Sequence, residues 1–356
     1  MQIDPKILKT DEQVAYSLRS IYRRFGYSQF KMSKFEEYAL YIKNKDFLVS
    51  DGIISFTDTN GRLLALKPDV TLSIINNSKD AGSNTQKLYY DENVYRISKS
   101  SKTYKEIRQT GLECIGNVGY FEVCEVLSLA IKSLESISKN YVFELSHIGL
   151  LEAVLEQCNL GNKSKQALSL INSKNLDDLR ILVADDKIFN TLSVFVKNFN
   201  CFDTALAELE TICESEKAKT ELEEFKSLLS FVADMGYEGN TKVDFSLAND
   251  MNYYCGVVFR GYISGIPVGV LSGGQYDKLM RKMGRDSGAI GFAVYLDTLE
   301  RYNMEQKQYD VDIVLLHKGD IAAALKKAQQ LSEDGSTVRI CTEIPENLRY
   351  RQLIEL

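Results

Sequence analysis

Histidine is scarce in this chain of 356 residues, and its scarcity excludes several kinds of active site. Only His147 and His317 are present, so a Ser-His-Asp or Cys-His centre, or a histidine-rich metal site, would have to use one of them. Neither lies in a recognisable motif, because each stands at the end of an apolar run. We therefore predict structural or capping roles for both histidines and no metal site.

Paired cysteines, a leader and long apolar runs are also missing. The seven cysteines are scattered and never form a Cys-x-x-Cys pair, which indicates reduced thiols rather than a disulfide framework or a zinc site. The N-terminus has no basic segment followed by an apolar one, and no stretch approaches the ~18 apolar residues of a membrane span. These absences predict a cytoplasmic protein without a membrane partner.

A surplus of basic residues is absent as well. Lys and Arg number 43 against 49 Asp and Glu, which gives a net charge of −6. Binding to a polyphosphate backbone requires clustered positive charge, so a nucleic-acid-binding protein is disfavoured and tRNA is not an expected partner. At roughly 100–200 residues per domain, the length suggests two domains, or one large domain with insertions.

The apolar patterns that are present predict an antiparallel sheet with flanking helices. Residues 53–58 and 62–66 are predicted strands joined by a link that contains Asn60-Gly61, the strongest short hairpin signal. Most other strands are likewise neighbours in sequence, which favours an α+β fold. Further strands are predicted at 87–97, 110–116, 141–147, within 242–272 and at 289–296, and helices at 8–25, 71–76, 120–136 and after residue 296.

The pattern changes near residue 150. Residues 151–236 are rich in helical periodicity, and no proline occurs between Pro68 and Pro267, so we predict an inserted helical subdomain. Residues 310–317, 321–332 and 337–342 predict the strand-helix-strand beginning of a small α/β unit. The expected organisation is a core in two parts with a helical insertion and a truncated C-terminal unit, with boundaries at 1–150, 151–238, 239–305 and 306–356.

Polar residues at strand ends mark the first candidate site. In the segment 67–71, Lys-Pro-Asp-Val-Thr, a carboxylate (Asp69) and a hydroxyl (Thr71) lie two residues apart at a strand-to-helix turn. Such a pair can hold an ammonium group, and it can equally cap the helix that follows.

A second candidate lies in residues 107–116. Alternate residues of a strand share a face, so Gln109, Gly111 and Glu113 point the same way, with Glu113 in an apolar run. A buried carboxylate needs a partner. Arg96 on a neighbouring strand is available either to pair with Glu113 or to face a zwitterionic ligand together with it.

Two further segments have features of a binding site. Tyr253 and Tyr254 are consecutive, so in a strand their rings would lie on opposite faces and one could enter a pocket. Gly273 and Gly274 allow a ligand to approach the backbone closely. A Gly-Gly turn is weak evidence by itself.

Taken together and in order, four segments resemble histidyl-tRNA synthetase and its non-synthetase relatives, which include the regulatory subunit of ATP phosphoribosyltransferase. The resemblance covers residues 8 to about 300 and implies the class II aminoacyl-tRNA synthetase fold. Residues 145–150, Leu-Ser-His-Ile-Gly-Leu, also look like the regulatory subunit. The four segments are residues 67–71, 108–116, 252–259 and 273–279.

The chain departs from the synthetase pattern where that pattern contacts ATP and the activated carboxylate. Asn249, Thr298 and Thr103 stand where the family has arginines, Ser98 stands in place of a glutamate, and Tyr295 replaces a small glycine. Activation of an amino acid needs cations where phosphate charge develops, and each such contact contributes several kcal/mol. We therefore expect no synthetase activity and no catalytic residues.

The resemblance implies that the amino-acid side of the pocket is retained. Asp69, Thr71 and Gln109 would take the α-ammonium of histidine, Glu113 and Tyr254 would address the imidazole, and Arg96 would meet the carboxylate. The full expected histidine-binding set is Asp69, Thr71, Arg96, Gln109, Glu113, Tyr253 and Tyr254.

A protein with this pocket and without ATP contacts is expected to regulate histidine biosynthesis. It would assemble with a short-form catalytic subunit of ATP phosphoribosyltransferase, be required for its activity, and transmit feedback inhibition by histidine. A self-dimer through the synthetase-like core is also expected, and no cofactor. Two alternatives stay open: a divergent synthetase-like ligase or adenylating enzyme, which would need ATP binding, and an RNA-binding module, which the acidic balance disfavours.

Overall fold

In the computed structural model the chain forms two compact units, Met1–Tyr302 and Asn303–Leu356. The structure describes residues 8–356 apart from 49–51, 79–83, 99–100, 251–252 and 300–308. Each unit is described below by itself.

The larger unit is built on a nine-stranded sheet in the order β1-β5-β6-β12-β11-β10-β7-β9-β8. The strands from β5 to β7 pair antiparallel, as the hairpin-like sequence pattern predicts, whereas β1 joins β5 and β9 joins β7 in parallel. The strands are β1 (Ser28–Gln29), β5 (Gln86–Ile97), β6 (Tyr104–Gly116), β7 (Tyr141–His147), β8 (Asn198–Phe199), β9 (Thr241–Asp244), β10 (Val257–Ile263), β11 (Leu271–Gln275) and β12 (Gly288–Tyr295).

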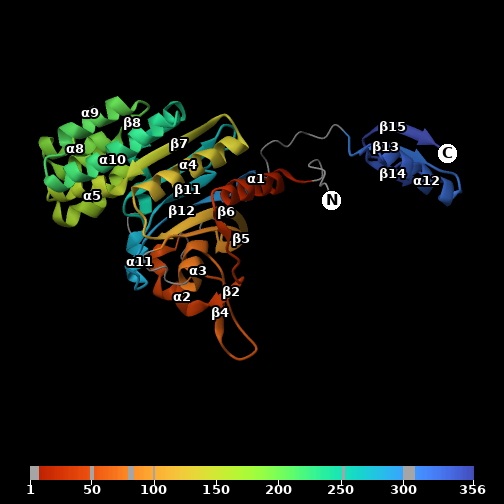
Figure 1. The fold of residues 1–356 in the computed structure, drawn as a ribbon, viewed down its shortest axis with the longest axis horizontal. Helices are drawn as coiled ribbons and strands as arrows, with labels where there is room; N and C mark the ends of the chain where they lie inside the picture. The colour runs from red at the N-terminus through yellow and green to blue at the C-terminus, as the bar shows by residue number, and fades with distance from the viewer. Residues whose placement is uncertain (1–7, 49–51, 79–83, 99–100, 251–252, 300–308) are drawn as a thin grey trace. The chain divides into compact units, whose positions relative to one another are not determined.

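Two helices, α1 (Thr10–Arg24) and α4 (Tyr120–Ile137), cover one face of this sheet (Figure 1). The buried residues of α1 recur at helical spacing, so one stripe of the helix packs on the sheet while the rest faces solvent. Tyr22 and Ser133 join the two helices through a buried hydrogen bond of 3.0 Å between their hydroxyl groups. This face carries the main apolar core and leaves the opposite face for the site.

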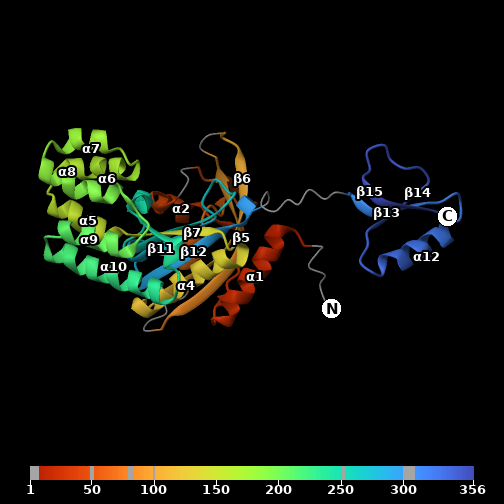
Figure 2. The same ribbon diagram turned by 90° about the horizontal axis from the view of Figure 1, so that it is seen from above.

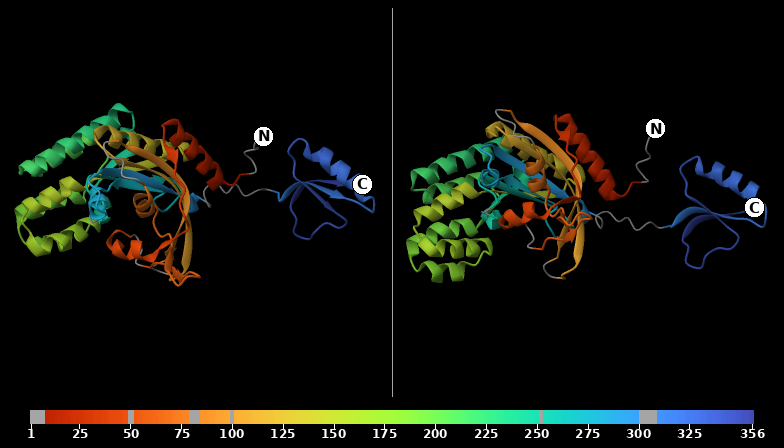
Figure 3. Two further views of the ribbon diagram at one scale, coloured as in Figure 1. Left: turned by 60° about the horizontal axis from the view of Figure 1, so that its bottom comes forward. Right: turned by 90° about the horizontal axis from the view of Figure 1, so that it is seen from below.

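The opposite face is covered by a small three-stranded sheet and short helices (Figures 1 and 3). Gly61 has φ +81° in the hairpin between β3 and β4, which confirms the predicted turn. Asp69 caps α3 by accepting a hydrogen bond from the backbone N–H of Leu72 at 2.9 Å. The elements are β2 (Phe35–Glu37), α2 (Tyr38–Lys43), β3 (Ser55–Thr57), β4 (Leu63–Leu66), α3 (Val70–Asn77) and α11 (Asp277–Lys282).

A group of helices between β7 and β9 gathers at one end of the sheet (Figure 2). Their positions follow the predicted helical periodicity within one or two residues at most ends. Their apolar side chains, among them Leu209 and Phe225, belong to the same core cluster as the sheet, and the domain boundaries stay a prediction. The helices are α5 (Ile148–Gln157), α6 (Ser164–Asn172), α7 (Leu176–Val183), α8 (Asp186–Ser193), α9 (Phe202–Ile212) and α10 (Glu216–Asp234).

The smaller unit is a three-stranded parallel sheet with one helix. The predicted strand, helix and strand are β13 (Val311–Leu316), α12 (Ile321–Ser332) and β14 (Val338–Cys341), in agreement with the sequence analysis. A third strand, β15 (Tyr350–Glu355), pairs with β13 and is absent from the sequence prediction, because its alternate residues are mostly exposed and its apolar pattern is weak.

The helix expected directly after β12 is not present in residues 296–299, the part of that segment which the structure describes. The chain there makes a single 3₁₀ turn, Leu296–Leu299, and the rest of the expected helix lies outside the described residues. Among the helices that the structure describes, none combines the length and apolar content needed to cross a membrane.

Candidate functional site

A cavity of about 110 Å³ opens on the face of the sheet that α1 and α4 leave free. All seven residues predicted to bind histidine line it, although they come from four separate segments of the chain. The β4–α3 turn supplies two of them, β5 one, β6 two, and the segment before β10 two. Sequence reasoning therefore selected residues that the fold brings to one place.

The floor of the cavity follows from strand alternation. Gln109 and Glu113 on β6 share a face, as predicted, and their partners on β12 are Tyr295 and Gly291. A Cβ atom at Gly291 would collide with the carboxylate of Glu113, so only glycine leaves room for that side chain. The glycine on β12 thus makes room for the Glu113 side chain at this end of the floor.

Glu113 is held by hydroxyl groups and not by a cation. Its exposed fraction is 1%, and it accepts hydrogen bonds from Tyr276 Oη at 2.5 Å and Thr71 Oγ1 at 2.8 Å. Burial raises the pKa of Glu113 to about 8, against the lowering effect of these two bonds. The alternative that Arg96 pairs with Glu113 is wrong, because Arg96 lies opposite Lys105 on β6, far along the ladder from Glu113.

Arg96 contacts the β4–α3 turn instead. Its Nε donates to the carbonyl of Pro68 at 2.9 Å, and its Nη2 lies 3.9 Å from Asp69 Oδ2. Burial raises the pKa of Asp69 while Arg96 and the capped backbone N–H of Leu72 oppose that rise. Asp69 therefore serves as helix cap through Oδ1 and presents Oδ2 toward Arg96 and the cavity, so that the two functions considered from sequence are compatible.

Tyr253 and Tyr254 both face the cavity, which corrects the expectation of one ring on each side of a strand. The two residues precede β10, which begins at Val257, so strand alternation does not apply to them. Their rings meet edge to face with centroids 4.7 Å apart. The ring of Tyr253 also lies 5.8 Å from that of Tyr276, so the cavity has an aromatic wall.

Sequence reasoning missed several lining residues. Gly273 and Gly274 lie within β11 and not in the turn expected from sequence. Tyr276 directly follows this strand and is 1% exposed, yet its own apolar pattern does not distinguish it from a core tyrosine. Tyr295 and Ser272 are also absent from the predicted binding set, although their hydroxyl groups lie 2.6 Å apart at the edge of the cavity. Long-range strand pairing brings these residues to the cavity. The available signals were the resemblance of residues 273–279, which include Tyr276, and the replacement of a glycine by Tyr295, but neither showed that the side chain lines the cavity.

Hydroxyl side chains stand at three described positions where the synthetase pattern has an arginine (Thr298 and Thr103) or a glutamate (Ser98). Thr298 Oγ1 donates to the carbonyl of Tyr295 at 2.6 Å, and the backbone N–H of Ser98 donates to the carbonyl of Thr103 at 2.9 Å. The side chain of Asn249 lies outside the described residues. Among the described residues that line the cavity, Arg96 is the one cation.

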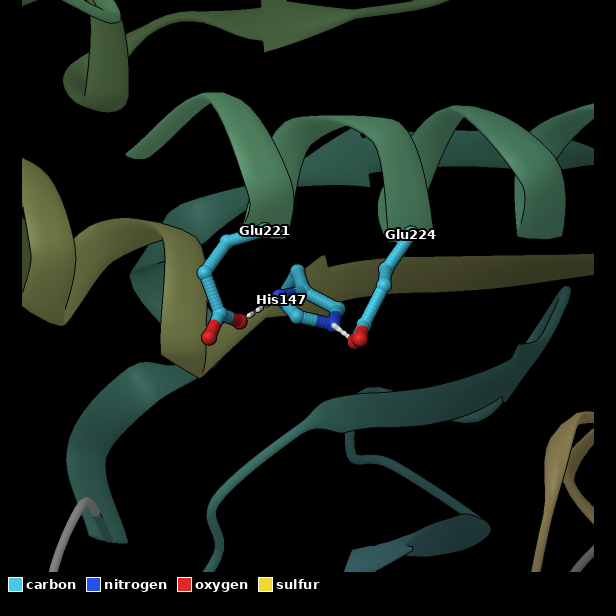
Figure 4. A group of neighbouring side chains, drawn as sticks. All are labelled: His147, Glu221 and Glu224. Atoms are coloured by element: carbon cyan, nitrogen blue, oxygen red, sulfur yellow. Dashed lines mark ion pairs between the residues drawn. The ribbon is translucent and has the colours of Figure 1, made fainter. Parts of the chain in front are cut away.

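A second group of titratable side chains lies where β7 meets α5 and α10 (Figure 4). His147 is buried, and its Nδ1 accepts a hydrogen bond from the backbone N–H of Leu150 at 3.2 Å. Glu221 Oε2 lies 3.5 Å from Nδ1 and Glu224 Oε2 lies 4.0 Å from Nε2. The three side chains are close enough to hold a metal ion, with ligand atoms within 4.8 Å of one another.

The chemistry of His147 favours capping over metal binding. Burial lowers the pKa of His147 to about 4, so the ring is neutral at pH 7. A neutral imidazole has one nitrogen lone pair, and here that lone pair accepts the N–H at the start of α5. The predicted capping role of His147 is confirmed.

The site is that of a synthetase-like protein. The sequence matches the family model described as histidyl-tRNA synthetase over residues 2–299. The chain therefore belongs to the histidyl-tRNA synthetase family.

Within this family, the curated relatives include regulatory subunits of ATP phosphoribosyltransferase, which confirms the predicted resemblance. The subunit from Clostridium kluyveri is 28% identical, over 93% of this chain and 89% of the relative. The subunit from Caldanaerobacter subterraneus subsp. tengcongensis is 26% identical, over 95% of this chain and 92% of the relative.

Solved structures confirm the class II synthetase-like fold. A protein of Bacillus halodurans C, named as an ATP phosphoribosyltransferase regulatory subunit/histidyl-tRNA synthetase, is similar with a TM-score of 0.75 at 24% identity, over 100% of this chain and 96% of that one. Histidyl-tRNA synthetase from Nostoc sp. PCC 7120 gives 0.73 at 16% identity, over 98% and 87%. A chain of the ATP phosphoribosyl transferase complex from Thermotoga maritima gives 0.64 at 22% identity, over 80% and 97%.

Proposed function

We propose that this chain is a non-catalytic regulatory subunit of ATP phosphoribosyltransferase that binds histidine in the cavity described above. The observation that carries the proposal is a contrast between the cavity and the positions at which the synthetase pattern has charged groups. The seven residues suited to an amino acid converge on the cavity, whereas Thr298, Ser98 and Thr103 replace charged groups of the synthetase pattern.

The cavity offers polar partners for the ammonium group and the imidazole of histidine. The ammonium group is met by Asp69, Thr71 and Gln109, which supply one carboxylate and two neutral oxygens. The imidazole lies between Glu113 and the aromatic wall at Tyr254. Glu113 is suited to this position because its carboxyl group, protonated near neutral pH, donates to one imidazole nitrogen or accepts from the N–H of the other, and burial strengthens such a bond.

The carboxylate of histidine is assigned to Arg96. In the structure the guanidinium is anchored by the Pro68 carbonyl, so it is already placed at the cavity before a ligand arrives. Its Nη2 lies 3.9 Å from Asp69, a loose contact that leaves donors available to a ligand carboxylate. A preplaced guanidinium lowers the entropy cost of binding.

Regulation requires that histidine binding favours one state of an assembly. The proposed partner is a short-form catalytic subunit that depends on this chain for activity, and the chain is proposed to pair with itself through its synthetase-like core, in the cytoplasm. Histidine shifts such an assembly only by its difference in affinity for the active and inhibited states. A transfer RNA is not a proposed ligand.

The test is to measure phosphoribosyl-ATP formation by the short catalytic subunit with and without this protein, across a histidine titration. We expect strong activation that histidine reverses, and loss of the histidine effect in Glu113→Ala. Glu223→Gln, at an exposed position of α10, is the matched control. A folded catalytic subunit that gains no activity would refute the proposal, and ATP–pyrophosphate exchange over an amino-acid panel would then test the ligase alternative.

A further inference from the structure

The floor of the cavity changes in size along its length. On the face that bears Glu113, β12 presents Gly291, then Ala293, then Tyr295, opposite Glu113, Gly111 and Gln109 of β6. Successive residues on one face of a strand lie about 7 Å apart, so this series spans the cavity from its deep end to its edge. The side chain of Glu113 therefore occupies the space above Gly291, whereas a tyrosine ring stands beside Gln109 at the other end of the series.

The ring of Tyr295 is fixed across the neighbouring strand. Its hydroxyl group lies 2.6 Å from Ser272 Oγ on β11, and Ser272 is the ladder partner of Ala293, one step further into the cavity. The side chain of Tyr295 thus reaches diagonally across to β11, one step toward Gly291. Its backbone is also held, because Thr298 Oγ1 donates to its carbonyl at 2.6 Å.

A polar shelf continues on the same face beyond this contact. Arg260 on β10 pairs with Ser272, and Glu144 on β7 pairs with Arg260. Both side chains are partly exposed, yet neither lines the cavity. The Tyr295–Ser272 contact therefore stands between the amino-acid cavity and a charged surface on which a longer ligand would otherwise extend.

We propose that Tyr295 and Ser272 form a gate that restricts the cavity to a free amino acid and excludes ligands enlarged at the carboxylate, aminoacyl nucleotides above all. The gate rests on the proposed function, because it presupposes that the cavity binds histidine. The proposal makes Tyr295 and Ser272 a pair that determines ligand specificity. The ring of Tyr295 excludes larger ligands by its volume, and this effect adds to the loss of phosphate-binding cations.

The experiment compares two ligands by calorimetry on the full chain: histidine and the non-hydrolysable adenylate analogue histidyl-sulfamoyl-adenosine. In the unmodified protein we expect the analogue to bind at least tenfold more weakly than histidine. In Tyr295→Ala the ratio of analogue affinity to histidine affinity is expected to rise at least tenfold. Tyr295→Phe, which keeps the ring and loses the hydrogen bond, should give a smaller rise.

Tyr262→Ala is the matched control, because Tyr262 shares the face of β10 that bears Arg260 and does not line the cavity. Its affinity ratio should equal that of the unmodified protein. A series of histidine, histidine amide and histidine benzyl ester, tested without any substitution, should show falling affinity with size at the carboxylate.

The outcomes separate the gate from the proposed function. Histidine that fails to bind the unmodified protein refutes the proposed function. Histidine that binds, with an analogue equally tight in the unmodified protein, overturns the gate alone. The gate is also overturned if folded Tyr295→Ala leaves the ratio unchanged, or if ester and amide bind as tightly as the free amino acid.

Discussion

Glu113→Gln is the substitution that most directly tests the electrostatics of the cavity. Glu113 is buried, and its pKa is raised from 4.5 to about 8 by that burial. The folded protein therefore holds a proton on Glu113 up to about pH 8, whereas the unfolded chain releases it near pH 4.5. Between these values the folded state binds more protons, so the contribution of Glu113 to stability falls as the pH rises.

The difference between the two pKa values corresponds to about 5 kcal/mol, which is the loss expected on raising the pH from below 4.5 to above 8. The amide introduced by Glu113→Gln does not titrate, so the variant escapes this loss. At pH 5 the two proteins should differ by only about 1 kcal/mol, because Tyr276 and Thr71 can rotate their hydroxyl groups to suit an amide.

Urea unfolding of both proteins at pH 5, 7 and 9, without ligand, measures this effect. We expect the variant to become progressively more stable than the unmodified protein as the pH rises. The difference between the two proteins isolates Glu113 from other buried carboxyl groups such as Asp69, whose pKa burial also raises. Stability curves that run parallel from pH 5 to 9 would refute the assignment of a protonated Glu113.

At pH 9, where Glu113 is ionised, the same variant should bind histidine roughly 10- to 150-fold more weakly than the unmodified protein, because a hydrogen bond to a charged group contributes about 1.5–3 kcal/mol. Calorimetry with Glu223→Gln as control measures the loss. An unchanged affinity would place the imidazole elsewhere in the cavity.

Three further substitutions test how the fold supports the site. Gly291→Ala places a methyl group where the Glu113 carboxylate lies, so it should lower the free energy of unfolding by about 1–3 kcal/mol in urea and also weaken histidine binding. The control Gly239→Ala meets no atom within 4 Å and should change neither quantity. His147→Ala removes the cap of α5 and should cost about 1 kcal/mol at pH 8. The cost should be smaller at pH 6, because the unfolded chain there protonates its histidine, whose pKa is 6.5, while the buried ring stays neutral; a cost that grew toward pH 6 would contradict a neutral capping ring. Lys67→Met breaks the 2.9 Å ion pair of this buried lysine with Glu92 and should lower the free energy of unfolding by about 3–5 kcal/mol, measured by heat or urea. Adding Glu92→Leu should restore part of the lost stability. Full stability in Lys67→Met alone would show that the pair contributes nothing.

Local sequence was sufficient for most helices and for several parts of the site. The Asn60-Gly61 turn, the cap at Asp69 and the shared face of Gln109 and Glu113 all depend on residues that are close together in the chain. Conformational preference and strand alternation act over a few residues, so a pattern in the sequence is enough to predict them.

The contacts between side chains of the site depend on pairing between distant segments of the chain, so only the tertiary structure decided them. Glu113 accepts a hydrogen bond from Tyr276, which is 163 residues away in the chain. Arg96 contacts the β4–α3 turn because the β5–β6 register places it far from Glu113. The contact of Tyr295 with Ser272 likewise exists because β11 and β12 lie side by side. The sequence by itself determined which residues suit a zwitterionic ligand, and the sheet register decided which of them meet, because register is fixed by the packing of the whole core and not by neighbours in the chain.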